Sequence, residues 1–418
     1  MPNHFVHVDI VYVLGLLAVL LAFAKGTGML AQWLGQPAVL GELVAGVLVG
    51  ASVFGFIDLK NHAPYPETEV LHVFAEIGVV LLLFAIGLET DLKKMLRVGG
   101  SATIVAVVGV AAPFALGFLV CWSLGLSSIV SIFAGAALTA TSVGITARVL
   151  SDLGRLQDPE SQIILGAAIL DDVIGLVILT VVTGLVEGGE LTILSIARPI
   201  GIAFAFLLTT LLVGRFVVPR LLQLVSYFEI AGTLTMVAVI LAFSLAWLAA
   251  TVGSAAIIGA FAAGLLIAGT PHGHKIEREV ATLGHLFVPI FFLIVGAAVD
   301  VSVLNPFEAA NHRTLFIGGL LIGVAIVGKF VAGYAPFWFR GSKNVIGVGM
   351  IPRGEVGLIF AQMGRSSGIF DDAMFSAITI TVMMTTFIAP PLLKLLLPAK
   401  PKPIDTPPDA IAEMMTDV

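Results

Sequence analysis

The sequence predicts an all-α polytopic membrane protein with about thirteen transmembrane helices, and three observations lead to this prediction. Hydrophobic residues make up 58% of the 418 positions and charged residues only 11%, with a mean hydropathy of +1.08. Ordinary soluble domains carry roughly a quarter charged residues. Apolar runs long enough to cross the hydrocarbon core recur along the chain, and basic residues gather in alternate connections between them.

The apolar runs indicate the positions of the expected spans. A helix needs about 20 mostly apolar residues to cross the hydrocarbon core, and about thirteen runs meet this criterion. Several are dense in Gly and Ala, which suits close helix packing in lipid. The runs begin near Val8, Ala38, Leu71, Ala102, Ile129, Ser161, Leu191, Ala231, Ser254, Ala281, Leu315, Val345 and Ala373.

The Lys and Arg residues indicate the orientation. Of the 21, 15 follow odd-numbered spans, 4 follow even-numbered spans, and Lys329 and Arg353 lie inside spans. Cytoplasmic connections carry the excess of basic residues in membrane proteins. We therefore expect the N-terminus outside and the C-terminus in the cytoplasm, and the regular alternation supports an odd number of spans.

The two ends of the chain carry further expectations. The N-terminal sequence MPNHFVHVDIVYVLG lacks the basic region and cleavage site of a signal peptide, so the first apolar run is expected to be a span. Residues 1–397 are expected to form one transmembrane domain, and the Pro-rich, polar residues 398–418 a short disordered cytoplasmic tail. Cys121 is the single cysteine, which excludes an intramolecular disulfide.

The sequence also contains an internal repeat. Three pairs of segments match in the same order, at separations of 209 to 218 residues. Each match is weak by itself, because Gly and Ala are common here, but three in order are not easily chance. The matches are PAVLGELVAGVLVG from Pro37 with SAAIIGAFAAGLLIA from Ser254 (Gly46 with Gly264), Gly87 and Asp91 with Gly296 and Asp300, and TSVGI from Thr141 with GEVGL from Gly354.

The repeat has consequences for the architecture. The matches place spans 2 to 6 opposite spans 9 to 13, and a separation of seven spans gives the two halves opposite topology. Inverted repeats are an architecture of secondary transporters, with substrate bound near the bilayer midplane where the repeats meet. We assign the first five-helix repeat to residues 37–190, linker helices to 191–250 and the second repeat to 251–397.

Two adjacent aspartates lie in the sixth span, in the sequence GAAILDDVIGLVIL from Gly166. Asp158 and Pro159 predict the start of this helix, and Asp171 then lies about 15 Å along it, half of the ~30 Å hydrocarbon core. Successive helical residues point about 100° apart, so Asp171 and Asp172 need different partners. A carboxylate at this depth is costly and indicates a functional site.

Few cations are available to neutralise these carboxylates. Lys329 is deep in the eleventh span and Arg353 is in the twelfth, and we take Lys329 as the partner of one aspartate. The other aspartate is left for water, a proton or a metal ion. By contrast, Asp371 and Asp372 precede the thirteenth span, where acids complement the helix dipole, and we interpret them as capping residues.

Spans 5 and 12 carry helix-weakening sequences at corresponding positions of the two halves. Span 5 contains ALTATSVGIT, with Thr141 and Ser142, and span 12 contains GMIPRGEVGL, with Pro352, Arg353 and Glu355. Paired interrupted helices indicate a substrate site in transporters. Freed carbonyls and the Thr141 hydroxyl are oxygen ligands that suit a small cation, although ordinary interhelical hydrogen bonding explains the threonines equally well. We interpret Arg353 and Glu355 as compensating each other and the span 5 backbone.

Other polar residues receive a structural interpretation. Glu42 and Glu76 lie within spans but nearer their ends, which favours a structural or vestibule role over ion binding. His272 and His274, in the sequence PHGHKIERE, are expected in a solvated cytoplasmic loop. A pH sensor or a metal site is the weaker interpretation of these histidines.

Several of these motifs together resemble a known family. The similarity is to the second family of monovalent cation/proton antiporters, closest to its NapA-type Na⁺/H⁺ antiporters, and it covers essentially the whole chain except the tail. The segments that carry it are GLETDLK (87–93), ATSVGITARVL (140–150), IILGAAILDDVIGL (163–176), the Gly-Lys pair of span 11 and PRGEVGLI (352–359).

The resemblance implies an NhaA/NapA-like fold with crossed, partly unwound helices, in a homodimer in the bacterial inner membrane, and a core that moves as an elevator against a dimerisation domain. It implies that Asp172 carries the ion and the proton and is the ligand of the monovalent metal ion. It further implies that Asp171 pairs with Lys329, that Thr141 is in the unwound helix, and that the Arg-Gly-Glu turn begins at Arg353.

The expected function is therefore secondary antiport of Na⁺ (or Li⁺) for H⁺ by alternating access, with both ions competing for Asp172. No cofactor, enzyme activity or nucleic-acid partner is expected. A K⁺/H⁺ antiporter of the same family is the alternative, although K⁺-efflux relatives typically lack the Asp-Asp pair and carry a C-terminal nucleotide-binding domain. A Na⁺-coupled organic solute symporter is more remote because it needs a roomy polar cavity, and a channel filter of TVGYG type is absent from the sequence.

Overall fold

The computed structural model describes residues 10–57, 66–186, 193–227, 230, 232–299 and 301–397, and these ranges contain sixteen α-helices and two short 3₁₀ segments. The predicted tail, 398–418, lies outside the described residues. The first eight helices are α1 (Ile10–Trp33), α2 (Ala38–Val49), α3 (Pro66–Glu89), α4 (Leu92–Arg97), α5 (Gly99–Ser123), α6 (Ser128–Ala137), α7 (Val143–Asp152) and α8 (Pro159–Val186). The others are α9 (Ile193–Ser226), α10 (Thr233–Thr251), α11 (Ala256–Ala268), α12 (Gly273–Ala297), η1 (Val301–Leu304), η2 (Ala309–Asn311), α13 (His312–Ala332), α14 (Lys343–Gly349), α15 (Glu355–Ser366) and α16 (Asp372–Leu396).

The helices follow the apolar runs of the sequence, which confirms the all-α prediction. In the described part of the chain, eight helices are long and apolar enough to cross a membrane, namely α1, α3, α5, α9, α10, α12, α13 and α16. The shorter helices α2, α6 and α11 are also apolar. Together with α8 and α14, these helices coincide with the predicted runs. The exact number of membrane crossings stays a prediction.

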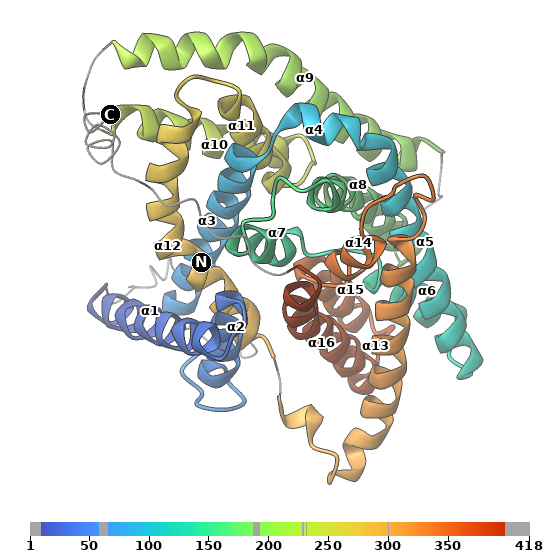
Figure 1. Cartoon of the computed structure of the whole chain (residues 1–418). Helices are drawn as coiled ribbons and strands as arrows, with labels where there is room; N and C mark the ends of the chain where they lie inside the picture. Colours follow the sequence, from blue (N-terminus) through green and yellow to red (C-terminus); the bar gives the residue numbers. More distant parts are fainter. Residues whose placement is uncertain are drawn as a thin grey trace, which may run out of the picture.

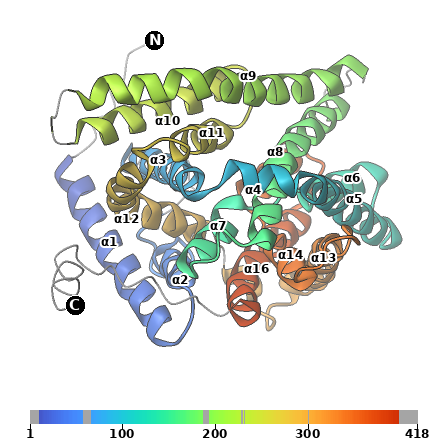
Figure 2. The ribbon, with the colours of Figure 1, turned by 45° about the horizontal axis from the view of Figure 1, so that its top comes forward.

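The helices form two groups that lie side by side, with α1, α2, α3 and α12 in one and α5, α13, α15 and α16 in the other (Figure 1). We call α1–α3 and α10–α12 the scaffold group, and α5–α8 and α13–α16 the core group. Helix α9 runs along one side of the molecule and packs on α8 of the core group and on α10 and α11 of the scaffold group (Figure 2).

Two glycine crossings bind the scaffold group together. At Gly46 of α2, an added Cβ would lie 2.1 Å from the Leu293 carbonyl oxygen and 2.7 Å from the Cα of Gly296 on α12. At Gly264 of α11, it would lie 2.7 Å from the Cα of Gly87 on α3. Only glycine permits such close backbone contact between helices. Because Gly46 aligns with Gly264 and Gly87 with Gly296, these crossings support the internal repeat, whose boundaries stay a prediction.

Helix α7 is where the core group meets the scaffold group. It packs on α2 and α3 as well as on α8 and α16 of its own group. At Gly144, an added Cβ would lie 3.4 Å from Leu82 of α3 and 3.6 Å from Phe291 of α12. The buried apolar residues of α3, α7 and α12 form one continuous cluster. The boundary between the two groups is therefore apolar at its middle.

Candidate functional site

Two helices of the core group are interrupted where the sequence predicts. Helix α6 stops at Ala137 and α7 resumes at Val143, while α14 stops at Gly349 and α15 resumes at Glu355. The second interruption contains Pro352, which has no N–H to donate to the helix. Both unwound segments are buried. Their backbone groups must therefore find partners outside a regular helix.

Hydrogen bonds join the two unwound segments directly. The Ser142 N–H donates to the Pro352 carbonyl at 2.8 Å, and the Thr141 hydroxyl donates to the Met350 carbonyl at 3.3 Å. The hydroxyl of Thr146 donates to the Gly349 carbonyl at 2.7 Å. The structure thus brings Thr141, Ser142 and Pro352 together, across about 210 residues of sequence.

Arg353 connects three segments of the core group. Its side chain is fully buried. One guanidinium nitrogen, Nη1, donates to the carbonyls of Thr139 and Ala140 at 3.0 Å each, and Nη2 donates to the carbonyl of Ala325 on α13 at 3.4 Å. Carbonyls freed by the α6–α7 interruption therefore accept hydrogen bonds from a cationic side chain, while the supporting role of Arg353 in span 5 stays a prediction. The Glu355 side chain lies outside the described residues.

Asp171 and Lys329 form the ion pair that the sequence predicts. The Lys329 ammonium donates to Asp171 Oδ2 at 2.8 Å, and both side chains are fully buried. Gly109 of α5 lies beside the ammonium, and an added Cβ there would be in ordinary van der Waals contact with Nζ, at 3.5 Å. The other carboxylate oxygen, Oδ1, has no hydrogen-bond partner among the described residues. The pair links α8 to α13 at the centre of the core group.

Asp172 lies next to this pair on α8 and is 8% exposed. It interacts electrostatically with Lys329, and Asp171 interacts with both Lys329 and Arg353. The centre of the core group therefore holds two carboxylates and two cationic side chains, so that their formal charges cancel.

The family is decided by comparison with known proteins. The family model described as "Sodium/hydrogen exchanger, transmembrane" matches residues 17–399, which is most of the chain. The chain belongs to this family. Among curated relatives, it is 44% identical to the high-affinity Na⁺/H⁺ antiporter NhaS3 of Synechocystis sp., over 94% of this chain and 92% of that protein.

Two further comparisons place the exchanger among its relatives. It is 34% identical to the Na⁺/H⁺-K⁺ antiporter GerN of Bacillus cereus, over 92% of this chain and 96% of that protein. Among solved structures, it resembles the sodium proton antiporter MjNhaP1 of Methanocaldococcus jannaschii with a TM-score of 0.64, covering 93% and 96% of the two chains at 17% identity. The structural likeness shows the fold alone.

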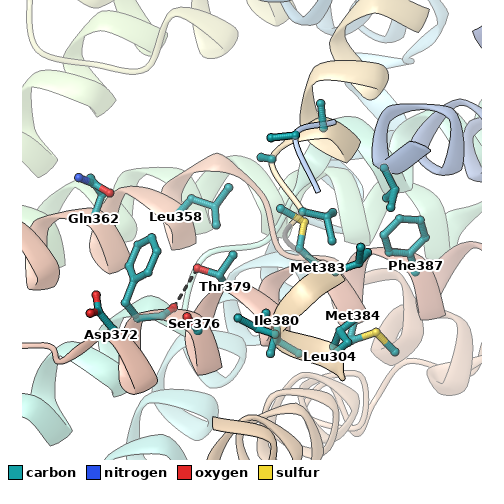
Figure 3. A pocket seen from close by; sticks show the side chains of 18 of the residues that line it. Leu304, Leu358, Gln362, Asp372, Ser376, Thr379, Ile380, Met383, Met384 and Phe387 are labelled. Atoms are coloured by element: carbon teal, nitrogen blue, oxygen red, sulfur yellow. Dashed lines mark hydrogen bonds between the residues drawn. The ribbon is translucent and has the colours of Figure 1, made fainter. Parts of the chain in front are cut away.

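A cavity of about 820 Å³ separates the scaffold group from the core group of the exchanger (Figure 3). Helix α2, the end of α12 and η1 line one side, and α15 and α16 line the other. Figure 3 shows Met383 and Phe387 of α16 at one end of the cavity and Gln362 and Asp372 at the other. Most of its lining is apolar, which does not suit the organic-solute symporter alternative.

Sequence reasoning did not show how deeply Glu42 is buried. Glu42 of α2 is 1% exposed, and its Oε2 has no hydrogen-bond partner among the described residues. It interacts electrostatically with Arg148 of α7 and Lys25 of α1. The signal for this burial in the sequence was a single acid within an otherwise apolar run. The position of a residue along its span does not reveal which side chains of other helices surround it. Glu76, by contrast, is exposed.

His272 and His274 lie at the start of α12, in the scaffold group. His272 precedes α12 as its N-cap residue and its side chain makes no capping hydrogen bond. The ring of His274 is fully exposed and lies 3.3 Å from Glu277. Among the described residues, no group of three or more His, Cys, Asp or Glu side chains is arranged to hold a metal ion. A His-based metal site therefore has no support in the described part of the chain.

Proposed function

We propose that this protein exchanges Na⁺ for H⁺ across the membrane, with Asp172 as the carboxylate that binds one or the other. The observation that carries the proposal is the position of Asp172. It is nearly buried, and it lies beside an Asp171–Lys329 pair that already balances one negative charge. The family of the chain and the name of the NhaS3 relative, a Na⁺/H⁺ antiporter, support Na⁺/H⁺ exchange.

Competition for a single carboxylate couples the two fluxes. A desolvated carboxylate is stable at this depth either as its protonated form or as a partner of a cation, and both at once would leave excess charge. Thr141 and the carbonyls of the two interruptions supply neutral oxygen ligands that can replace part of the cation's hydration shell. The exchange needs no cofactor or covalent chemistry.

Lys329 is proposed as a second group that responds to the cation. Its ammonium is held by Asp171 at 2.8 Å and also interacts with Asp172. A cation that approaches these carboxylates competes with the ammonium for their oxygens, and the ion pair can break as the ion binds. Lys329 would then lose its compensation and release a proton. This gives the site a second proton-linked step.

Potassium exchange is the second candidate for the transported ion. The GerN relative, which is 34% identical, is named as an antiporter of K⁺ as well as of Na⁺. Na⁺, Li⁺ and K⁺ all accept oxygen ligands, and discrimination among them depends on cavity size and ligand field. The residues of the site therefore indicate a monovalent cation, but they do not select among Na⁺, Li⁺ and K⁺.

A single flux experiment tests these proposals. The purified protein is reconstituted in liposomes with a preset pH gradient and a pH-sensitive dye, and Li⁺, Na⁺ or K⁺ is added. Na⁺-dependent collapse of the gradient supports Na⁺/H⁺ exchange, and a response to K⁺ alone would support the second candidate. Collapse without any added cation would indicate a proton leak and contradict antiport.

We further propose a homodimer in the bacterial inner membrane, with the N-terminus outside, the C-terminus in the cytoplasm, and elevator movement of the core group against the scaffold group. The 15-to-4 distribution of basic residues supports the orientation. A cysteine at Asn3 should react with an impermeant thiol reagent on intact cells, and a cysteine at Thr406 should not. The opposite labelling pattern would contradict the orientation.

A further inference from the structure

The scaffold and core groups touch through polar side chains at the ends of α3 and α7. The Ser151 hydroxyl of α7 lies 3.4 Å from both carboxylate oxygens of Glu89, the last residue of α3. The side-chain amide of Gln157, which follows α7, donates to the Glu89 backbone carbonyl. The Lys94 ammonium in turn donates to the side-chain oxygen Oε1 of Gln157 at 3.1 Å. Glu89 thus receives hydrogen bonds from the core group at both its side chain and its backbone.

Two further contacts join the groups at the same end of the molecule. The Lys394 ammonium, at the end of α16, donates to the Gly35 carbonyl between α1 and α2. Glu42, near the start of α2, interacts electrostatically with Arg148 of α7. In the proposed orientation, all of these helix ends face the cytoplasm.

The opposite end of the boundary is open. The cavity of about 820 Å³ lies between the outer parts of α2 and α12 and the outer parts of α15 and α16 (Figure 3). Ser376 and Thr379 of α16 line it on the core side, and Ala51 and Val299 line it on the scaffold side. Hydrogen bonds thus join the two groups at one end, while space separates them at the other.

We propose that Glu89, Ser151 and Gln157 form a latch that holds the transporter open to the outside, and whose release permits the inward-open state. This inference rests on the proposed function and orientation, because only an alternating-access transporter needs two such states. To open the cytoplasmic side, α7 must leave α3, and the Ser151 and Gln157 hydrogen bonds to Glu89 must break. Removing these hydrogen bonds destabilises only the outward-open state, so the equilibrium shifts toward the inward-open state.

The first test measures the population of the outward-open state by the rate at which a cysteine in the cavity is labelled. Ser376→Cys lines the cavity, and the native Cys121 is fully buried. On intact cells, an impermeant maleimide should label Ser376→Cys readily. Adding Ser151→Ala, Glu89→Ala or Gln157→Ala should shift the equilibrium constant between the two states inward by about threefold to tenfold, as expected when hydrogen bonds of one state are lost, and labelling should slow as the outward population falls.

Two controls sharpen this test. Glu76→Ala removes an exposed carboxylate from the same helix, and it should leave the labelling rate unchanged. Glu89→Gln keeps an acceptor for the Ser151 hydroxyl, so its effect should be smaller than that of Glu89→Ala. Equal labelling rates for Ser376→Cys alone and for Ser376→Cys combined with Ser151→Ala or Glu89→Ala would overturn the latch. If Ser376→Cys without further substitutions does not react, the outward-open assignment is wrong.

The second test closes the latch covalently. In a variant with Glu89→Cys and Ser151→Cys, a short bifunctional thiol reagent that is cleavable by reductant should abolish exchange in liposomes, and reductant should restore it. Exchange that continues at full rate after verified cross-linking would overturn the latch.

Failure of the proposed function is distinguishable from failure of the latch, because labelling needs no transport. A parent that exchanges no cation, but whose labelling responds to Ser151→Ala, would refute the antiport and retain the latch.

Discussion

The chain contains two Asp-Asp pairs, and the structure places them in opposite environments. Asp171 is fully buried on α8 and holds Lys329 at 2.8 Å, and Asp172 beside it is 8% exposed. Asp371 precedes α16, accepts a hydrogen bond from the Met374 N–H at 2.8 Å and pairs with an exposed Arg313 at 2.9 Å. The side chain of Asp372 is 87% exposed.

The difference shows that surroundings, not residue type, decide what a carboxylate does. At the start of α16, water solvates both acids, and they only cap a helix and complement its dipole. On α8, no bulk solvent compensates the charge, so each acid depends on Lys329, Arg353 or a transported ion.

The largest difference should be in transport. Asp172→Asn is expected to reduce cation-dependent proton flux in liposomes to the level of protein-free liposomes, because an amide is close in shape but cannot exchange a proton. The matched change Asp372→Asn should alter the flux by less than about twofold, since an exposed acid contributes little at ordinary salt. Substantial exchange by purified, folded Asp172→Asn would contradict the role assigned to Asp172.

The next largest effect concerns the buried ion pair. Lys329→Gln leaves Asp171 buried without its cation and should lower the free energy of unfolding by about 3–5 kcal/mol. Adding Asp171→Asn should recover part of this loss, because no unpaired charge then remains. The exposed pair of Arg365 and Asp372, 3.0 Å apart, should show a coupling of less than about 1 kcal/mol.

Unfolding in detergent with a double-mutant cycle measures both couplings. The same preparations should show whether residual exchange by Lys329→Gln moves less net charge per cycle, which a current measurement on supported membranes reports. A coupling energy of zero between Asp171 and Lys329 would show that the pair does not form and would remove the proposed second proton-linked step.

A smaller effect is expected at Arg353. Arg353→Gln would leave the Thr139 and Ala140 carbonyls without their charged donor and should destabilise the protein by about 2–3 kcal/mol. Arg353→Lys should recover only part of this, because one ammonium cannot reproduce the geometry of the guanidinium. Arg365→Gln at the exposed pair is the control, and a loss equal to that of Arg353→Gln would contradict the bridging role.

The smallest effect should come from the helix cap. Asp371→Ala removes the acceptor for the Met374 N–H and should cost about 1 kcal/mol in stability. Asp371→Asn keeps that acceptor and should cost less, and neither change should alter the flux of Na⁺. A thermal shift in detergent compares the two variants. A drop in flux for Asp371→Asn would indicate that the exposed pair does more than cap the helix.

The sequence alone was sufficient for the positions of the apolar helices, the burial of the Asp171–Asp172 pair and the two helix interruptions. Each depends on local properties: the length of an apolar run, the spacing along one helix, and the placement of Pro352 and Gly354. The choice of Lys329 as partner also succeeded, because buried cations are so few in this chain that elimination leaves two candidates. The roles of these residues in transport stay predictions.

Only the tertiary structure decided which carbonyls Arg353 reaches, how deeply Glu42 is buried and where Glu89 meets Ser151. These contacts join helices that are 62 to 214 residues apart in the sequence. They depend on the angle and depth at which helices cross, and crossings such as Gly46 on Gly296 are set by backbone packing in three dimensions. Hydropathy predicts that a residue is buried, but it does not predict which side chains or backbone groups it contacts in the folded protein.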